Sequence, residues 1–193
     1  NEILLNGVTG SGKTEVYIQA IRKFVDVGFG AIVLVPEISL TPQTVKRFVE
    51  RLGDKVAVFH SRLNNGQKYD EWLKVKEGRA KVVVGARSAL FMPVNNLGIV
   101  VIDEEHDSSY KSGQTPYYHA REVAEELCRI KNATLVLGSA TPDVSTYYKA
   151  RNGEIELVEL TKRTNSKPLP KVQIVDMREE LVAGNKTIFS RKL

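Results

Sequence analysis

Residues 7–14 read Gly7-Val8-Thr9-Gly10-Ser11-Gly12-Lys13-Thr14, which matches the pattern G-x-x-x-x-G-K-[ST] at every fixed position. Glycines in this pattern let backbone N–H groups turn inward around phosphate oxygens, and the helix that follows adds the positive end of its dipole. Lys13 is placed to face the β- and γ-phosphates, and the Thr14 hydroxyl to ligate Mg²⁺. All eight residues are therefore predicted to bind a nucleotide, and a simple glycine-rich turn is the alternative.

Short apolar runs and amphipathic stretches alternate along the chain around this loop. Runs rich in β-branched residues occur at 3–5, 31–35, 56–59, 81–85, 99–102 and 134–137, and each is typical of a strand buried on both faces. Apolar residues at helical spacing lie between them, within 17–24, 45–52 and 120–127. This alternation predicts an α/β fold with a mainly parallel sheet and helices on both faces. Ligands bind such a sheet at the carboxyl ends of its strands.

The composition excludes several classes of protein. The 193 residues are 42% hydrophobic and 26% charged, close to globular averages, so a disordered or fibrous chain is excluded. The single cysteine, Cys128, cannot form an intramolecular disulfide or a cysteine cluster for zinc, and we expect it in the core. We expect a cytoplasmic protein that does not span a membrane.

The net charge of +5 is confined to one end of the chain. Residues 161–193 hold 8 basic and 3 acidic side chains, which leaves 20 of each sign for residues 1–160. A basic excess is often a sign of nucleic-acid binding. Because residues 1–160 are formally neutral, any inference about nucleic acid has to come from motifs instead.

The run Asp103-Glu104-Glu105-His106 directly follows the apolar residues 99–102. A carboxylate at the end of a buried strand can hold the Mg²⁺ of a bound nucleotide, and the next carboxylate can polarise an attacking water. We therefore expect Asp103 to hold the metal and Glu104 to act as general base, with Lys13 completing the catalytic set. Acidic residues also cap helices, but a phosphate loop in the same chain favours nucleotide hydrolysis.

With these residues the chain resembles the superfamily-2 helicases, and within them the branch that restarts DNA replication. Five stretches carry the resemblance in the order of the family's motifs, namely residues 7–14, 34–43, 84–91, 103–106 and 138–142. The resemblance implies a phosphate-loop NTPase lobe of RecA-like fold from an ATP-dependent helicase that moves 3′ to 5′ on DNA. It implies ATP and Mg²⁺ as cofactors, single-stranded and forked DNA as substrates, and primosome and replication proteins as partners.

The same resemblance implies roles for residues outside the phosphate loop. Some would contact the DNA strand and others would couple the nucleotide to it: Pro36, Thr41 and Gln43 along the strand, Arg87 at a phosphate, and His106, Ser139 and Thr141 as the coupling group. Simpler interpretations stay open, because Pro36 can end a strand, Thr41 can cap a helix, and Arg87 can be a surface charge.

Three tyrosines, Tyr110, Tyr117 and Tyr118, lie within nine residues just after the acidic tetrad. Bases stack on aromatic faces whatever their sequence, at roughly 1–3 kcal/mol each. The segment resembles the aromatic-rich loop that couples DNA binding to hydrolysis in this family. Alternatively, Tyr117 and Tyr118 pack against the start of the next helix.

We expect residues 1–160 to be the ATP-binding lobe and residues 161–193 to be a linker followed by the start of a second lobe. The linker is predicted at 161–171, which holds two prolines, and a further strand at 172–176. The resemblance implies that zinc-binding cysteines and a second lobe with an arginine finger lie elsewhere in the full-length protein. We therefore expect the isolated chain to bind nucleotide weakly and to hydrolyse it very slowly.

Three other functions compete with this interpretation. Another superfamily-2 DNA translocase or repair helicase would share the five stretches. A small-molecule kinase also begins with a phosphate loop on a parallel sheet, but it needs an acceptor pocket. A nucleic-acid-binding module that does not hydrolyse nucleotide would not need intact residues at Lys13, Thr14, Asp103 and Glu104.

Overall fold

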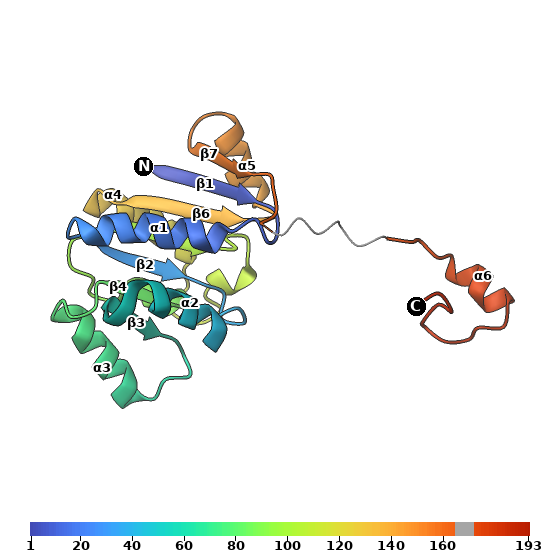
Figure 1. Cartoon of the computed structure of the whole chain (residues 1–193), viewed down its shortest axis with the longest axis horizontal. Coiled ribbons are helices and arrows are strands. Elements are labelled where there is room, and N and C mark those ends of the chain that lie inside the picture. The colour runs from blue at the N-terminus through green and yellow to red at the C-terminus, as the bar shows by residue number, and fades with distance from the viewer. Residues whose placement is uncertain (165–171) are drawn as a thin grey trace.

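The computed structural model describes residues 1–164 and 172–193, and its centre is a seven-stranded parallel sheet (Figure 1). The strands run in the order β3-β4-β2-β5-β6-β1-β7 across the sheet. Their bounds are β1 Glu2–Gly7, β2 Gly30–Leu34, β3 Val56–Phe59, β4 Val82–Gly85, β5 Leu97–Asp103, β6 Thr134–Ser139 and β7 Glu156–Leu160. Six of the seven strands coincide with the apolar runs of the sequence, so the parallel sheet was correctly predicted.

Helices cover both faces of this sheet, as predicted. Helices α1 (Lys13–Asp26) and α2 (Pro42–Leu52) pack on one face through Tyr17, Ile21 and Phe48. The other face is covered by α3 (Asn65–Lys76), α4 (Ala120–Lys131) and α5 (Val144–Arg151), and by the short 3₁₀ turn Arg87–Phe91. Cys128 lies buried in this second layer, as expected.

Strand register brings distant motifs to one edge of the sheet. Asp103 at the end of β5 pairs with Gly138 of β6, and Ser139 pairs with Asn6 of β1. Leu34 at the end of β2 lies between Ile102 and Gly85. The loops that follow β1, β2, β4, β5 and β6 therefore all leave the sheet at the same edge, where a ligand is expected.

One expectation for the end of the chain needs correction, and one strand there was not predicted. Residues 172–176 form no strand and instead lead into the short helix α6 (Met177–Val182). The last strand of the sheet is β7, which the sequence analysis missed because its edge position leaves Glu156 and Glu159 exposed and breaks the apolar run. Most of the predicted linker, residues 165–171, lies outside the described residues.

Within residues 1–164 and 172–193, no helix combines the length and the apolar character that crossing a membrane requires.

Candidate active site

The phosphate loop joins β1 to α1 and adopts a conformation that glycine makes possible. Gly10 and Gly12 have φ angles of +80° and +91°, in the left-handed region that favours glycine. Gly7 is needed for a different reason, because a Cβ there would lie 2.6 Å from Ser11 Oγ. The Ser11 hydroxyl is buried and has no hydrogen-bond partner among the described residues. An orphaned hydroxyl inside a glycine-rich turn fits a loop built to receive phosphate oxygens.

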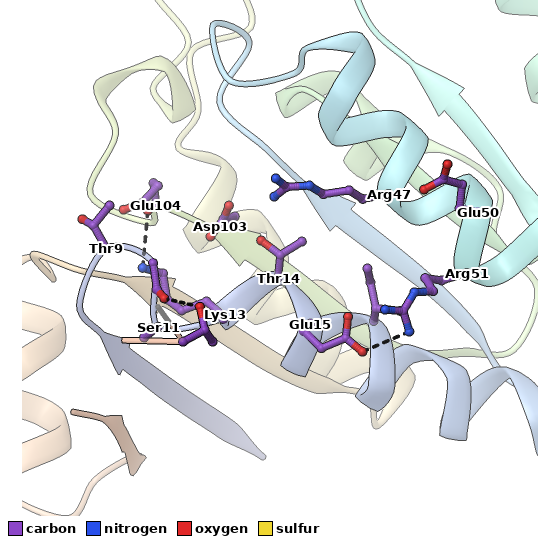
Figure 2. A pocket seen from close by; sticks show the side chains of 14 residues that line it. Thr9, Ser11, Lys13, Thr14, Glu15, Arg47, Glu50, Arg51, Asp103 and Glu104 are labelled. Atoms are coloured by element: carbon purple, nitrogen blue, oxygen red, sulfur yellow. Dashed lines mark hydrogen bonds and ion pairs between the residues drawn. The ribbon is translucent and has the colours of Figure 1, made fainter. Parts of the chain in front are cut away.

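Lys13 begins α1 and lies almost completely buried beneath the loop. Its Nζ donates a hydrogen bond of 2.8 Å to the carbonyl of Gly7. The same atom is 3.6 Å from Glu104 Oε1 (Figure 2). A buried ammonium needs paired acceptors, and both of these come from strand ends that lie on either side of β6. Lys13 therefore joins the phosphate loop to the acidic tetrad.

Asp103 ends β5 and accepts a hydrogen bond of 3.0 Å from the hydroxyl of Tyr17. Burial raises the pKa of the Asp103 carboxyl above its ordinary value, the charge of Glu104 adds to this, and Tyr17 and Lys13 oppose it. The pKa of Tyr17 is also raised, mainly by burial, so its hydroxyl stays a donor. Tyr17 has room to reach Asp103 because residue 138 is glycine, and a Cβ there would overlap the tyrosine oxygen.

Oxygen donors near the phosphate loop suit a magnesium ion. The Thr14 hydroxyl and the Asp103 carboxylate line the same pocket (Figure 2). Magnesium is usually bound by one or two protein oxygens together with phosphate oxygens and water. Residues 1–164 and 172–193 contain no group of three His, Cys, Asp or Glu that could hold a metal. The Thr14 hydroxyl and the Asp103 carboxylate supply two such protein oxygens, so this donor pair fits Mg²⁺ bound together with a nucleotide.

The rest of the tetrad connects this site to the loop after β6. His106 Nδ1 lies 2.8 Å from Ser139 Oγ and 3.8 Å from Glu104 Oε2, while its Nε2 lies 3.5 Å from Thr141 Oγ1. Glu104 has a φ of +47°, which is uncommon for a residue with a side chain. Strain of this kind persists where surrounding contacts fix the backbone. The predicted coupling residues are thus in contact with each other and with the candidate general base.

The pocket extends from the phosphate loop to α2, on a side that the sequence analysis missed. It has a volume of about 620 Å³, and α2 contributes Arg47, Glu50 and Arg51 to its wall. Arg51 pairs with Glu15 of α1 at 3.3 Å, whereas the guanidinium of Arg47 points into the pocket on the side of Thr14 and Asp103 (Figure 2). The sequence does contain a signal for this side of the pocket: two arginines stand one helical turn apart on α2, beside the buried Phe48.

Replacing Arg47 by Ala should weaken ATP binding about 5- to 30-fold, because a cation facing a triphosphate across a partly exposed pocket contributes about 1–2 kcal/mol. Titration of a fluorescent ATP analogue against the full-length protein would measure the Kd. Arg22→Ala is the matched control, since Arg22 lies on α1 outside the pocket and pairs with Asp26. Equal affinities for the two variants would contradict the expectation.

Thr164 also lines the pocket and was not predicted. Its backbone N–H and its hydroxyl both donate to the carbonyl of Gly10, at 3.0 and 2.9 Å. The chain that leaves β7 therefore returns to the tip of the phosphate loop. Residues just beyond 160 thus still pack on the nucleotide-binding lobe.

Residues expected to follow the DNA strand fall into two groups. Pro36 is buried two residues after the end of β2, and its carbonyl accepts from the N–H of Ser39, so the chain turns there instead of continuing the strand. Thr41 caps α2, because its Oγ1 accepts from the N–H of Thr44 at 3.2 Å. Gln43 is exposed in the first turn of α2. The simpler roles left open for Pro36 and Thr41, the end of a strand and the cap of a helix, are thus seen in the structure. Thr41 and Gln43 are exposed to solvent.

Arg87, which follows β4, contacts the loop after β5 that holds the three tyrosines. Arg87 donates to the carbonyls of Ser109 and Lys111, and its guanidinium lies 5.5 Å from the ring centre of Tyr118. Tyr110 is 1% exposed and donates through its hydroxyl to the carbonyl of Asp103, at 2.6 Å. The stacking role expected for Tyr110 therefore needs correction, because its buried ring presents no face to a base.

The two other tyrosines differ in exposure. The side chain of Tyr117 is 75% exposed, whereas Tyr118 is half-buried and meets Phe91 edge to face at 5.3 Å. Tyr118 thus packs against Phe91 and Arg87 of the 3₁₀ turn after β4, and not against the start of α4 as the alternative interpretation has it. Tyr117 is thus the most exposed of the three tyrosines.

The fold and the site together define a phosphate-loop nucleotide-binding lobe, with its loop after β1 and its acidic tetrad after β5. A family model described as DEAD/DEAH box helicase matches residues 1–150. The chain therefore belongs to the DEAD/DEAH box helicase family.

Curated relatives are similar over almost the whole of this chain. It is 55% identical to the replication restart protein PriA of Bacillus subtilis (strain 168), over 98% of this chain and 24% of the relative. It is 50% identical to the replication restart protein PriA of Synechocystis sp., over 100% of this chain and 24% of the relative. The chain thus spans about a quarter of the length of the curated relatives it matches.

Solved helicase structures share the fold. RecG bound to a three-way DNA junction is 26% identical, with a TM-score of 0.58 over 84% of this chain and 21% of RecG. The Pyrococcus furiosus Hef helicase domain is 20% identical, with a TM-score of 0.59 over 83% of this chain and 35% of that domain. These likenesses confirm the predicted RecA-like lobe.

Proposed function

We propose that this chain is the ATP-binding motor lobe of an ATP-dependent DNA helicase that moves 3′ to 5′ and acts in replication restart at stalled forks. The observation that carries the proposal is the 3.6 Å approach of Lys13 Nζ to Glu104 Oε1. This approach places the lysine of the phosphate loop beside the candidate base. Similarity to the replication restart protein PriA over the whole chain supports the choice of process.

Different residues of the site would bind the phosphates, hold the metal ion and activate the water. Lys13 and the N–H groups of residues 7–14 would bind the β- and γ-phosphates, and Thr14 and Asp103 would hold Mg²⁺. When bound, the ion neutralises charge that develops on the phosphates. Glu104 would orient a water and accept its proton, since its carboxylate lies beside Lys13 at the phosphate end of the pocket.

The DNA-facing part of the proposal depends on the edge where the strands end. Thr41 and Gln43 are exposed after β2, and Tyr117 is exposed in the loop after β5. These residues would contact single-stranded or forked DNA, with Arg87 nearby in contact with the same loop. His106, Ser139 and Thr141 would transmit the state of the nucleotide to this edge. RecG, a relative of similar fold, was solved on a three-way DNA junction.

The organisation of the full-length protein is also part of the proposal. Residues 1–160 would form the first motor lobe, and residues 161–193 would connect it to the second. Primosome and replication proteins would be the partners, and the zinc site would belong to another part of the protein. Without the second lobe, the isolated chain would bind ATP weakly and hydrolyse it slowly.

The experiment that tests this function compares ATP hydrolysis by the full-length protein with and without single-stranded DNA. Wild-type hydrolysis should rise at least about tenfold with DNA. Lys13→Ala should abolish unwinding of a forked substrate and leave DNA binding within about twofold, because the lysine contacts phosphates of the nucleotide and not of DNA. Lys23→Ala, on the exposed side of α1, is the matched control.

Three results would support the competing functions instead. Phosphorylation of a small molecule without any effect of DNA would indicate a kinase. Unchanged activity in Lys13→Ala would indicate a nucleic-acid-binding module that does not use its nucleotide site. A repair helicase or another translocase would show stimulation by DNA but no function in restart at stalled forks.

A further inference from the structure

Glu105, the third residue of the tetrad, is a buried carboxylate that the proposed chemistry does not use. It is 2% exposed, although it stands between Glu104 and His106 at the end of β5. Its Oε2 accepts from Thr146 Oγ1 at 3.1 Å and from Arg121 Nη1 at 3.3 Å. A buried carboxylate is retained only where charged or polar donors satisfy it, and here those donors come from α4 and α5.

The same residue holds the loop after β6 at both of its ends. The backbone N–H of Glu105 donates to the carbonyl of Gly138 at 3.0 Å, where β6 is about to end. Its Oε1 accepts from the backbone N–H of Asp143 at 2.6 Å, where α5 is capped. Both ends of the segment 138–143 are therefore hydrogen-bonded to Glu105. Ser139 and Thr141 lie between these two ends.

His106 can reach both hydroxyls only because the loop has this shape. Its two ring nitrogens lie 2.8 Å from Ser139 Oγ and 3.5 Å from Thr141 Oγ1. The Thr141 N–H also donates to Ser139 Oγ at 3.0 Å, which closes a small ring of contacts. Movement of the Asp143 end would carry Thr141 away from His106, while Ser139 stays fixed by its place in β6.

Arg121 supplies the positive charge that compensates the Glu105 carboxylate, and it links this carboxylate to α4. It donates through Nη1 to Thr146 Oγ1 at 2.7 Å as well as to Glu105, and its Nε lies 3.6 Å from Glu125. Arg121 stands at the start of α4, directly after the loop that holds Tyr117 and Tyr118. The carboxylate of Glu105 thus lies where α4, α5 and the loop between β6 and α5 meet.

We infer that Glu105 is a positioning residue that fixes the loop 138–143, so that His106 can couple the nucleotide site to DNA. The inference rests on the proposed function, because coupling has a meaning only in a DNA-stimulated ATPase. Glu105 does not face the nucleotide pocket, whose lining includes Asp103 and Glu104. Its loss should therefore act on DNA stimulation and not on nucleotide binding.

The test uses Glu105→Gln in the full-length protein. Glutamine keeps the size of the side chain but has one acceptor oxygen, so it can serve Asp143 or the Thr146–Arg121 pair but not both. The DNA-stimulated kcat should fall about 10- to 100-fold, in line with the effect of displacing an active-site group by about an ångström. The KM for ATP and the rate without DNA should stay within about twofold.

Hydrogen exchange provides a second readout that does not depend on catalysis. In Glu105→Gln, backbone amides within 139–143 should exchange at least about tenfold faster than in the wild type, with α1 unchanged. Glu126→Gln is the matched control, because Glu126 pairs with Arg129 on the exposed side of α4. If Glu105→Gln does not fold, Thr146→Val serves as the substitute test. It removes one hydrogen-bond donor to Glu105 while keeping the shape of the side chain, and it should give an intermediate loss of DNA stimulation.

The possible outcomes separate the inference from the proposed function. Full DNA stimulation and unchanged exchange in Glu105→Gln would overturn the inference, and so would an equal loss of ATP affinity and stimulation. A wild-type protein that DNA does not stimulate would overturn the proposed function. In that case, faster exchange at 139–143 in Glu105→Gln would still support the claim that Glu105 fixes the loop 138–143, and unchanged exchange would reject it.

Discussion

Replacing Glu104 by Gln in the full-length protein should lower the kcat of ATP hydrolysis by about 10²- to 10⁴-fold, the usual contribution of a general base. The amide has the same size and can still accept a hydrogen bond, but it cannot take a proton from water. ATP affinity should not fall, because the substitution removes a negative charge that lies 3.6 Å from Lys13 Nζ and beside the phosphate loop. Single-turnover hydrolysis and equilibrium binding of ATP would measure the two quantities separately.

The control for this variant is Glu50→Gln. Glu50 lines the same pocket from α2 but pairs with Lys46 at 3.6 Å and is exposed. Its replacement should change kcat by less than about threefold. A similar loss of kcat in both variants would show that the total charge of the pocket matters and not a base at position 104.

The part of this site that could be predicted from sequence is the part whose chemistry is local. Residues 7–14 need only their own backbone and the start of a helix to bind phosphate, so their spacing was sufficient. Asp103 and Glu104 could be assigned because they end an apolar run, and the parallel sheet then places that end near the loop.

Residues that act through tertiary contacts were missed or misjudged. Tyr17 was read as part of an apolar helix face, yet its hydroxyl bonds to Asp103 across 86 residues of sequence. Tyr110 was expected to stack on a base, whereas the loop after β5 folds it into the core. A sequence pattern reports that a side chain is aromatic and near a motif, but not which way the backbone turns it.

Glu105 and Arg47 show the same limit for charged residues. Glu105 stood inside a recognised motif, but only the packing of α4 and α5 reveals that its carboxylate is buried and paired. Arg47 stood on the predicted helix, but the angle between α1 and α2 decides that it faces the pocket. Helix packing angles depend on the side chains of both partners, so the sequence of one helix does not determine them.

The end of β4 is the place where a single added methyl group should do most damage to folding. Gly85 pairs with Leu34 of β2 on one side and Phe59 of β3 on the other. A Cβ at position 85 would overlap the backbone carbonyl of Phe59 and lie 2.7 Å from Ala89 Cβ. The first obstacle is backbone that is held in the sheet, so the strand has to shift, whereas a flexible side chain would simply turn away.

Gly85→Ala should therefore lower the free energy of unfolding of residues 1–193 by about 3 kcal/mol, at the upper end of the usual cost of overpacking. For a chain of this length that corresponds to a fall in Tm of about 6–12 °C. Gly66→Ala is the matched control, since a Cβ there would lie 3.4 Å from Asn64 Oδ1, an ordinary contact, on the exposed side of α3. It should leave Tm unchanged or raise it slightly, because alanine favours a helix over glycine.

Thermal unfolding followed by circular dichroism would compare the two variants with the wild type. The displacement in Gly85→Ala should also reach Arg87, two residues on, whose guanidinium bonds to the carbonyls of Ser109 and Lys111 in the loop after β5. Any variant protein that remains folded should then show faster hydrogen exchange at residues 109–111. A Tm within about 2 °C of the wild type would mean that β3 and β4 can separate at little cost, and that the close approach of Gly85 to Phe59 is not needed for the fold.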